Sequence, residues 1–169
     1  VLDRDNTLIM SDEIYAELHF SGQHVSIARY YPEGTIVSGG LSKWCGAGGW
    51  RLGTFAFPAN LGWLKDAMAT VASETYTSTA APIQYAAVRA YVGGIEIENY
   101  LFQSRRILSC LSQTLVAKLV QAGFDIAPTE GGFYLFLDFS GFQSHLSERG
   151  VNQGVQLCEL LLNDIGVAL

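Results

Sequence analysis

The 169-residue sequence predicts an α/β protein that contains part of a mixed, mostly parallel sheet, followed by part of a small α+β domain. Two observations support this prediction. Short apolar runs alternate with longer segments of helical periodicity, which is typical of strands buried between helices. Hydrophobic residues make up 49% of the chain and charged residues only 15%, as in a protein with a packed interior.

Three strands are predicted in the first part of the chain. Residues 6–11 form a short apolar run that ends in polar residues, which suits a buried parallel strand with a functional carboxyl end. Residues 35–38 and 54–57 are predicted to be two further strands, joined by a glycine-rich loop. Asp12 and Tyr15 follow the first strand, so we expect them at the carboxyl edge of the sheet.

The middle of the chain is predicted to be helical. Residues 61–75 and 82–92 show helical periodicity, and Pro82 lies in the first turn of the second helix, where its missing N–H costs nothing. Residues 77–79 are polar and are predicted to cap this helix. A long helix is predicted for residues 96–122. Its apolar stripe comprises Leu101, Leu108, Leu111, Leu115 and Leu119, and Arg105, Gln113 and Lys118 are expected to face away from it.

The last part of the chain has the pattern of a small α+β domain. Residues 124–127 and 133–139 are predicted to be strands, and residues 152–163 a helix, which gives a β-β-α order. The aromatic residues 133–136 are predicted to form the core of the second strand. We place the domain boundary inside the long helix.

Charge and cysteine content limit the partners that the sequence allows. A formal net charge of −6 and a pI near 4.9 argue against nucleic acid or an anionic membrane surface as a partner. No apolar run approaches the ~18 residues of a membrane span. Cys45, Cys110 and Cys158 form no C-x-x-C motif, which fits a reducing cytosol, so we expect a cytoplasmic protein.

No metal site is predicted, because the three histidines lie far apart and lack the spacing of metal ligands. They are His19, His24 and His145, and no role is assigned to them.

The glycine-rich loop of residues 39–53 carries Lys43 and Arg51, eight residues apart. A primary amine can hold an aldehyde as an imine, and a guanidinium can bind phosphate oxygens in a bidentate manner. This pair suits pyridoxal 5'-phosphate, which carries both groups. A P-loop is excluded because Lys43 follows Ser42 instead of preceding a serine or threonine, and a G-x-G-x-x-G motif fails because Arg51 occupies the place of its last glycine.

Several motifs in this order resemble those of the class I/II aminotransferases, and the resemblance spans nearly the whole chain. The motifs are Asp12-Glu13-Ile14-Tyr15, Ser42-Lys43, Gly49-Trp50-Arg51-Leu52-Gly53, Pro82-Ile83-Gln84-Tyr85-Ala86-Ala87 and Gly131-Gly132-Phe133-Tyr134. The resemblance implies the fold-type I architecture of pyridoxal-phosphate-dependent transferases. Residues 1–98 would form the second half of the large cofactor-binding domain, and residues 99–169 the interdomain helix with part of the C-terminal small domain.

The resemblance also implies a role for five residues. Lys43 would form a Schiff base with the cofactor aldehyde and transfer the substrate's α-proton. Asp12 would keep the pyridine nitrogen protonated, and Tyr15 would bind the phenolate oxygen. Arg51 and Ser42 would bind the phosphate.

Three of these residues also have an ordinary structural interpretation. Lys43 could be an exposed surface lysine, Asp12 a turn cap, and Tyr15 a half-buried residue bonded to the backbone. Ser78 or Thr79 could reach the phosphate of a partner subunit, although helix capping is the stronger interpretation of both. The resemblance also implies that Gly131, Gly132 and Phe133 line the substrate entrance, although the core of a strand is the simpler interpretation of residues 133–136. Many family members have a phosphate-binding serine where this chain has Gly40, so Arg51 is the main predicted anchor.

The function implied is the transfer of an amino group between an α-amino acid and a 2-oxo acid by a homodimer that acts in amino acid metabolism. A pyridoxal-phosphate-dependent β-elimination lyase or synthase shares the same motifs and is an alternative. A further alternative is a regulatory or dimerisation domain without turnover. We expect the chain to be an internal fragment that is inactive on its own, because the family's ring-stacking aromatic residue and substrate-binding arginine have no match here. The amino acid substrate is left open.

Overall fold

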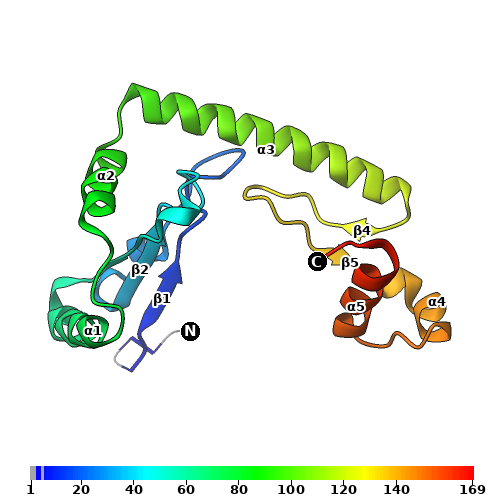
Figure 1. Cartoon of the computed structure of the whole chain (residues 1–169), viewed down its shortest axis with the longest axis horizontal. Helices are drawn as coiled ribbons and strands as arrows, with labels where there is room; N and C mark the ends of the chain where they lie inside the picture. Colours follow the sequence, from blue (N-terminus) through cyan, green and yellow to red (C-terminus); the bar gives the residue numbers. More distant parts are fainter. Residues whose placement is uncertain (1–2, 5) are drawn as a thin grey trace. The chain divides into compact units, whose positions relative to one another are not determined.

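The computed structural model describes residues 3–4 and 6–169, which divide into two compact units (Figure 1). The first unit runs to Cys110 and also includes Glu130–Phe133. The second unit comprises Leu111–Thr129 and Tyr134–Leu169. The division falls within one long helix, and each unit is described by itself below.

A three-stranded sheet lies at the centre of the first unit. Its strands, in spatial order, are β1 (Ile9–Asp12), β2 (Thr35–Gly40) and β3 (Gly53–Ala56). Strand β1 is parallel to β2, with Asp12 opposite Ser38, and β2 is antiparallel to β3, with Gly40 opposite Gly53. The predicted mixed sheet is therefore confirmed, and the carboxyl ends of β1 and β2 lie at the same edge.

Helices follow the sheet as the sequence predicts. They are α1 (Gly62–Thr75), α2 (Ala81–Val92) and α3 (Ile95–Gln121). The described first unit also has four short 3-10 helices, at Ile27–Arg29, Pro32–Gly34, Gly48–Trp50 and Ala59–Leu61. The predicted cap of α2 by residues 77–79 is wrong. The N-cap is Ala80, and the Thr79 carbonyl instead accepts a hydrogen bond of 2.6 Å from Gln84 Nε2.

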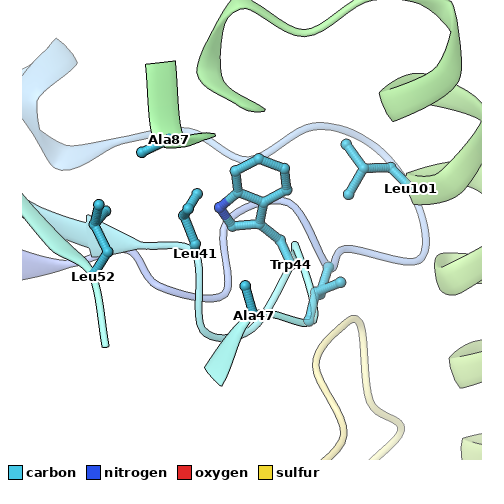
Figure 2. Close-up of a cluster of buried hydrophobic side chains, with 7 residues drawn as sticks. Leu41, Trp44, Ala47, Leu52, Ala87 and Leu101 are labelled. Atoms are coloured by element: carbon cyan, nitrogen blue, oxygen red, sulfur yellow. The ribbon is translucent and has the colours of Figure 1, made fainter. Parts of the chain in front are cut away.

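The core of the first unit is built largely from the loop that joins β2 to β3 (Figure 2). Its buried members are Leu18, Leu41, Trp44, Ala47, Leu52, Ala87 of α2 and Leu101 of α3. Each fully buried leucine contributes roughly 1.5–3 kcal/mol relative to an exposed one. The loop is thus anchored by its own apolar residues, and its backbone has a defined course.

Helix α3 departs from the predicted pattern at two places. Leu101 is buried and Leu108 half-buried, but Leu111 and Leu115 are exposed. Arg105, predicted to face away from the apolar stripe, donates hydrogen bonds to the carbonyl oxygen (2.6 Å) and to Oε2 (2.8 Å) of Glu17. The sequence did not predict this contact of Arg105 with Glu17.

Besides the end of α3, the described second unit contains a 3-10 helix at Ser140–Phe142, two short strands and two α-helices. They are β4 (Asp125–Ile126), antiparallel to β5 (Leu137–Asp138), α4 (Gln143–Glu148) and α5 (Gly154–Ile165). The Phe124 ring packs against Phe139 and Phe142, with centroid distances of 5.1 and 4.8 Å. Residues 133–136 are not the core of a strand, because they precede β5 and Phe136 is 92% exposed.

Candidate functional site

Asp12 is the last residue of β1, and its carboxylate is oriented by two hydrogen bonds. Oδ1 accepts one from the Ile14 N–H at 3.3 Å and one from Ser38 Oγ at 3.2 Å. The first is the turn-capping contact expected from a structural role. The second comes from the neighbouring strand, where Ser38 is the register partner of Asp12. Among the described residues both bonds end on Oδ1, so Oδ2 is available to a ligand.

The structure brings Lys43 and Tyr15 together. Lys43 Nζ lies 5.6 Å from the centre of the Tyr15 ring and 5.5 Å from that of Phe133. Tyr15 is half-buried and packs against the core, and Lys43 is half-buried between the buried residues Leu41 and Trp44. Two elements, the turn after β1 and the loop after β2, thus place an amine beside a phenol.

The backbone of this loop is closed by its own hydrogen bonds. Leu41 N–H donates to the Leu52 carbonyl at 3.3 Å, and Ala47 N–H donates to the Leu41 carbonyl at 3.2 Å. Gly46 N–H donates to the Lys43 carbonyl at 3.3 Å, with Gly46 at φ +64°. The loop therefore holds the Lys43 backbone in one place, as a reactive amine requires.

Gly40 is required by the close approach of β2 to the end of the loop. A Cβ atom added at Gly40 would lie 2.6 Å from the Leu52 carbonyl oxygen and 3.2 Å from Gly53 Cα. Cβ atoms do not come that close to backbone atoms, so no side chain fits there. In this chain the contact leaves no room for a serine at position 40. Ser42, one residue before Lys43, is half-buried.

Arg51 is exposed and has an unusual backbone conformation. Its φ and ψ angles of 56° and 47° lie in the left-handed region, and its Nη1 donates to the Gly48 carbonyl at 2.6 Å. Such a conformation in a residue other than glycine costs roughly 1–2 kcal/mol. The structure records no contact of Arg51 with Asp12, Tyr15 or Lys43 within the described part of the chain.

A cavity of about 360 Å³ opens on the sheet near this site, in the first unit. Its lining includes Glu13, Ser38, Trp44, Tyr91 and Leu101. The predicted cofactor residues Asp12, Lys43 and Arg51 do not line it. The structure thus joins Lys43 with Tyr15, and Asp12 with the neighbouring strand, but it does not enclose the predicted set in this cavity.

Glu13 is a residue of the site that sequence reasoning missed. Its side chain is 12% exposed, and its oxygens contact three partners: Oε1 accepts from Ser11 Oγ (3.0 Å) and Ser26 Oγ (2.5 Å), and Oε2 lies 2.8 Å from His24 Nε2. Burial raises the pKa of Glu13. The three hydrogen bonds and the charge of His24 together lower it by more than burial raises it, so the pKa of Glu13 is below its usual value. No spacing rule in the sequence links these residues.

Three further features of the described chain concern its cysteines, its potential metal ligands and its helices. The cysteines Cys45, Cys110 and Cys158 are free, and burial raises the pKa of the Cys45 thiol. Over residues 3–4 and 6–169, no cluster of three or more histidine, cysteine, aspartate or glutamate side chains could hold a metal ion. The helices in that same part of the chain are too short or too polar to cross a membrane.

Comparison with known proteins gives a consistent result. The family model for aminotransferase class I and II matches residues 1–169. Aspartate aminotransferase of Geobacillus stearothermophilus is 39% identical over 134 residues, which cover 76% of this chain and 33% of that protein. The asparagine–oxo-acid transaminase of Streptococcus mutans is 30% identical over 98% of this chain and 41% of that protein.

Solved structures agree with these sequence matches. The aspartate aminotransferase of Thermus thermophilus with maleate superposes with a TM-score of 0.81 and 28% identity, over 96% of this chain and 40% of that chain. The aromatic aminotransferase of Pyrococcus horikoshii superposes with a TM-score of 0.79 and 26% identity, over 95% of this chain and 41% of that chain. The present chain spans only 33% to 42% of the length of these and other relatives.

Proposed function

The chain belongs to the class I and II aminotransferases, and from this membership we propose that the whole protein is a pyridoxal-phosphate-dependent aminotransferase. It moves an amino group between an α-amino acid and a 2-oxo acid. The observation that supports this most directly is the meeting of the Lys43 amine with the Tyr15 ring, next to the carboxyl ends of β1 and β2. A lysine with that neighbour, on a fold shared with solved aminotransferases, suits a carbonyl-binding amine.

The residues present fit the groups of this cofactor. When bound, pyridoxal phosphate supplies an electron sink for the negative charge left on a substrate carbon after proton removal. Lys43 would hold the cofactor covalently and, when free, accept and return a proton at Nζ. Asp12 fits the pyridinium nitrogen, because its Oδ2 has no hydrogen-bond partner among the described residues and Oδ1 is fixed by Ser38 and Ile14.

Tyr15 and Arg51 complete the proposed set. The Tyr15 hydroxyl would donate to the cofactor's phenolate oxygen, since its ring lies next to Lys43. Arg51 would bind the phosphate: only Nη1 is used by the Gly48 carbonyl, so its other N–H groups are available for a bidentate contact. Ser42, adjacent to Lys43, is proposed as an additional phosphate ligand.

We also propose that the protein is a cytoplasmic homodimer whose small-molecule partners are amino and 2-oxo acids. The support for a dimer is the apolar surface of α2, on which Tyr85, Val88 and Val92 are all exposed. The support for a reducing compartment is that the three cysteines are free.

The test uses the full-length protein with added pyridoxal phosphate. We expect a visible absorption band from lysine-bound cofactor in the wild type and in Lys65→Ala, an exposed lysine on α1, and no band in Lys43→Ala. An unchanged band in Lys43→Ala would refute the role of Lys43.

A second measurement decides the reaction. The loaded protein is incubated with an amino acid and a 2-oxo acid, and exchange of the amino group is expected. Release of ammonia with pyruvate, without exchange, would assign the protein instead to the β-elimination lyases that share these motifs.

A further inference from the structure

The Lys43 amine lies against two aromatic rings that come from distant parts of the sequence. Its Nζ is 5.6 Å from the Tyr15 ring centre and 5.5 Å from that of Phe133. The two rings contact each other edge to face, with centres 5.4 Å apart and planes at 69°. Both distances are within the ~6 Å at which a cation over a ring face is attracted to it. No ion pair among the described residues involves Lys43.

The segment that carries Phe133 is anchored to the same part of the first unit. Phe20 N–H donates to the Glu130 carbonyl at 2.7 Å, Gly132 N–H donates to the Leu18 carbonyl at 2.8 Å, and His19 and Gly131 form an isolated β-bridge. These contacts lie three to five residues beyond Tyr15 along the chain. Residues 130–132 are therefore tied to the turn that also carries Tyr15.

Two glycines, Gly131 and Gly132, allow this segment to approach the turn closely. A Cβ atom at Gly131 would lie 2.7 Å from the Leu18 carbonyl oxygen, so only glycine permits the approach. Gly132 has φ +70°, and its ideal Cβ position is 3.8 Å from Tyr15 Cδ1. The ring of the next residue, Phe133, is consequently delivered to a defined position beside Lys43.

We propose that Phe133 is a positioning residue for Lys43, whose free ε-ammonium is held against the paired rings of Phe133 and Tyr15. This inference rests on the proposed function, in which Lys43 must release its amine and later recapture the cofactor. A free lysine side chain has four rotatable bonds and would otherwise sample many conformations. The ring pair keeps the ammonium at the site, because a cation is attracted to the ring faces.

The experiment measures how fast Lys43 reacts with trinitrobenzenesulfonate, which only the uncharged amine attacks. Full-length protein is first freed of cofactor with hydroxylamine, then labelled at fixed pH, and each lysine is quantified by mass spectrometry of a digest. Lys65 and Lys118 report in the same digest as internal controls. Phe133→Leu keeps an apolar side chain but removes the ring, whereas Phe133→Tyr keeps the ring.

We expect Phe133→Leu to label Lys43 about two- to fivefold faster than wild type, the size of a partly exposed cation–π contact, and Phe133→Tyr to label it at nearly the wild-type rate. In Phe133→Trp, whose ring attracts a cation more strongly, Lys43 should be labelled more slowly than in wild type. This variant replaces Phe133→Leu as the test if the leucine variant does not fold. Equal Lys43 rates in the leucine and tyrosine variants, or a tryptophan variant no slower than wild type, would overturn the inference.

The two proposals fail in different ways. A wild-type protein without the cofactor band would overturn the proposed function and, with it, any role of Phe133 in that reaction. Equal labelling of the leucine and tyrosine variants, in a protein that shows the band, would overturn only the ring contact.

Discussion

Arg51 combines a proposed ligand role with a strained backbone, and substitutions can separate the two. Arg51→Gly removes the guanidinium but accepts the left-handed conformation, so we expect the free energy of unfolding to change by less than about 1 kcal/mol. The affinity of the full-length protein for pyridoxal phosphate, measured by absorbance titration, should fall about 10- to 100-fold, as expected for loss of hydrogen bonds to a charged group.

Arg51→Lys is the matched control. It retains the positive charge and the backbone strain but loses the bidentate fork, so an intermediate affinity is expected. An Arg51→Gly protein that binds pyridoxal phosphate as tightly as wild type would contradict the phosphate-binding role.

The lowered pKa of Glu13 predicts that this residue contributes to stability in a pH-dependent way. Its pKa is lower in the folded protein than in the unfolded chain, where 4.5 is the ordinary value. The carboxylate therefore stabilises the fold above pH 4.5, and this contribution is lost as the pH falls through the lower folded-state pKa. Glu13→Gln should cost about 1–2 kcal/mol of unfolding free energy at pH 7, where hydrogen bonds to the charged group are intact.

The measurement is urea denaturation of wild type and Glu13→Gln at pH 7 and near pH 3. Glu159→Gln, at an exposed position of α5, serves as the control and should match wild type at both pH values. A difference between wild type and Glu13→Gln that stays the same at low pH would show that the contribution of Glu13 does not depend on its charge.

At these positions the sequence indicates which chemical groups the side chains carry, but not which other side chains they contact. Lys43 and Arg51 were predicted from residue type and spacing, and Asp12 and Tyr15 from the resemblance of a short motif to a family; both kinds of signal are local. The bonds of Glu13 to Ser26 and His24 could not be identified, because they join side chains through a loop that has no periodic pattern.

The short segment of Glu130–Phe133 depends on the absence of a side chain at Gly131. In Gly131→Ala the new Cβ would clash with the Leu18 carbonyl oxygen, and we expect a loss of about 1–3 kcal/mol of unfolding free energy. Gly141→Ala is the matched control, because its Cβ would meet no atom within 4 Å. Urea denaturation of the full-length variants makes the comparison, and equal stabilities would mean that this segment is not held as described.

The elements were predicted well where their pattern is long and strongly periodic. The helices α1, α2, α3 and α5 and the strands of the main sheet lie within a few residues of their predicted positions. The predicted strand at residues 133–139 was too long, since an apolar aromatic run alone does not distinguish a strand from an extended segment. Helix α4 was missed, because six residues carry too little periodicity to be recognised.

Large apolar side chains are exposed on several elements of the described chain, among them Met10 of β1, Phe55 of β3, Trp63 of α1 and Tyr85 of α2. Exposed apolar surface of this kind usually contacts other protein. Since the chain spans about a third to two fifths of the length of its relatives, we expect these residues to be covered in the full-length protein. The assignment of residues 1–98 and 99–169 to two domains stays a prediction.

The 169-residue chain expressed alone should therefore associate and lack activity. We expect it to elute as soluble aggregates in size-exclusion chromatography and to show no amino-group exchange with pyridoxal phosphate, an amino acid and a 2-oxo acid. The physical reason is that transition-state stabilisation needs a closed site, and here Asp12 and Arg51 are exposed. The full-length protein is the positive control, and measurable turnover by the short chain would contradict the prediction.

The amino-acid sequence by itself determined the order of helices and strands, the glycine-rich loop with its lysine and arginine, and the resemblance to a family. These follow from periodicity and residue type over short stretches of chain. Only the tertiary structure decided that Phe133 lies beside Lys43, that Ser38 orients Asp12, and that no side chain fits at Gly40. Such contacts join segments far apart in the chain, and their pairing depends on burial and hydrogen bonding summed over the fold, which no local pattern contains.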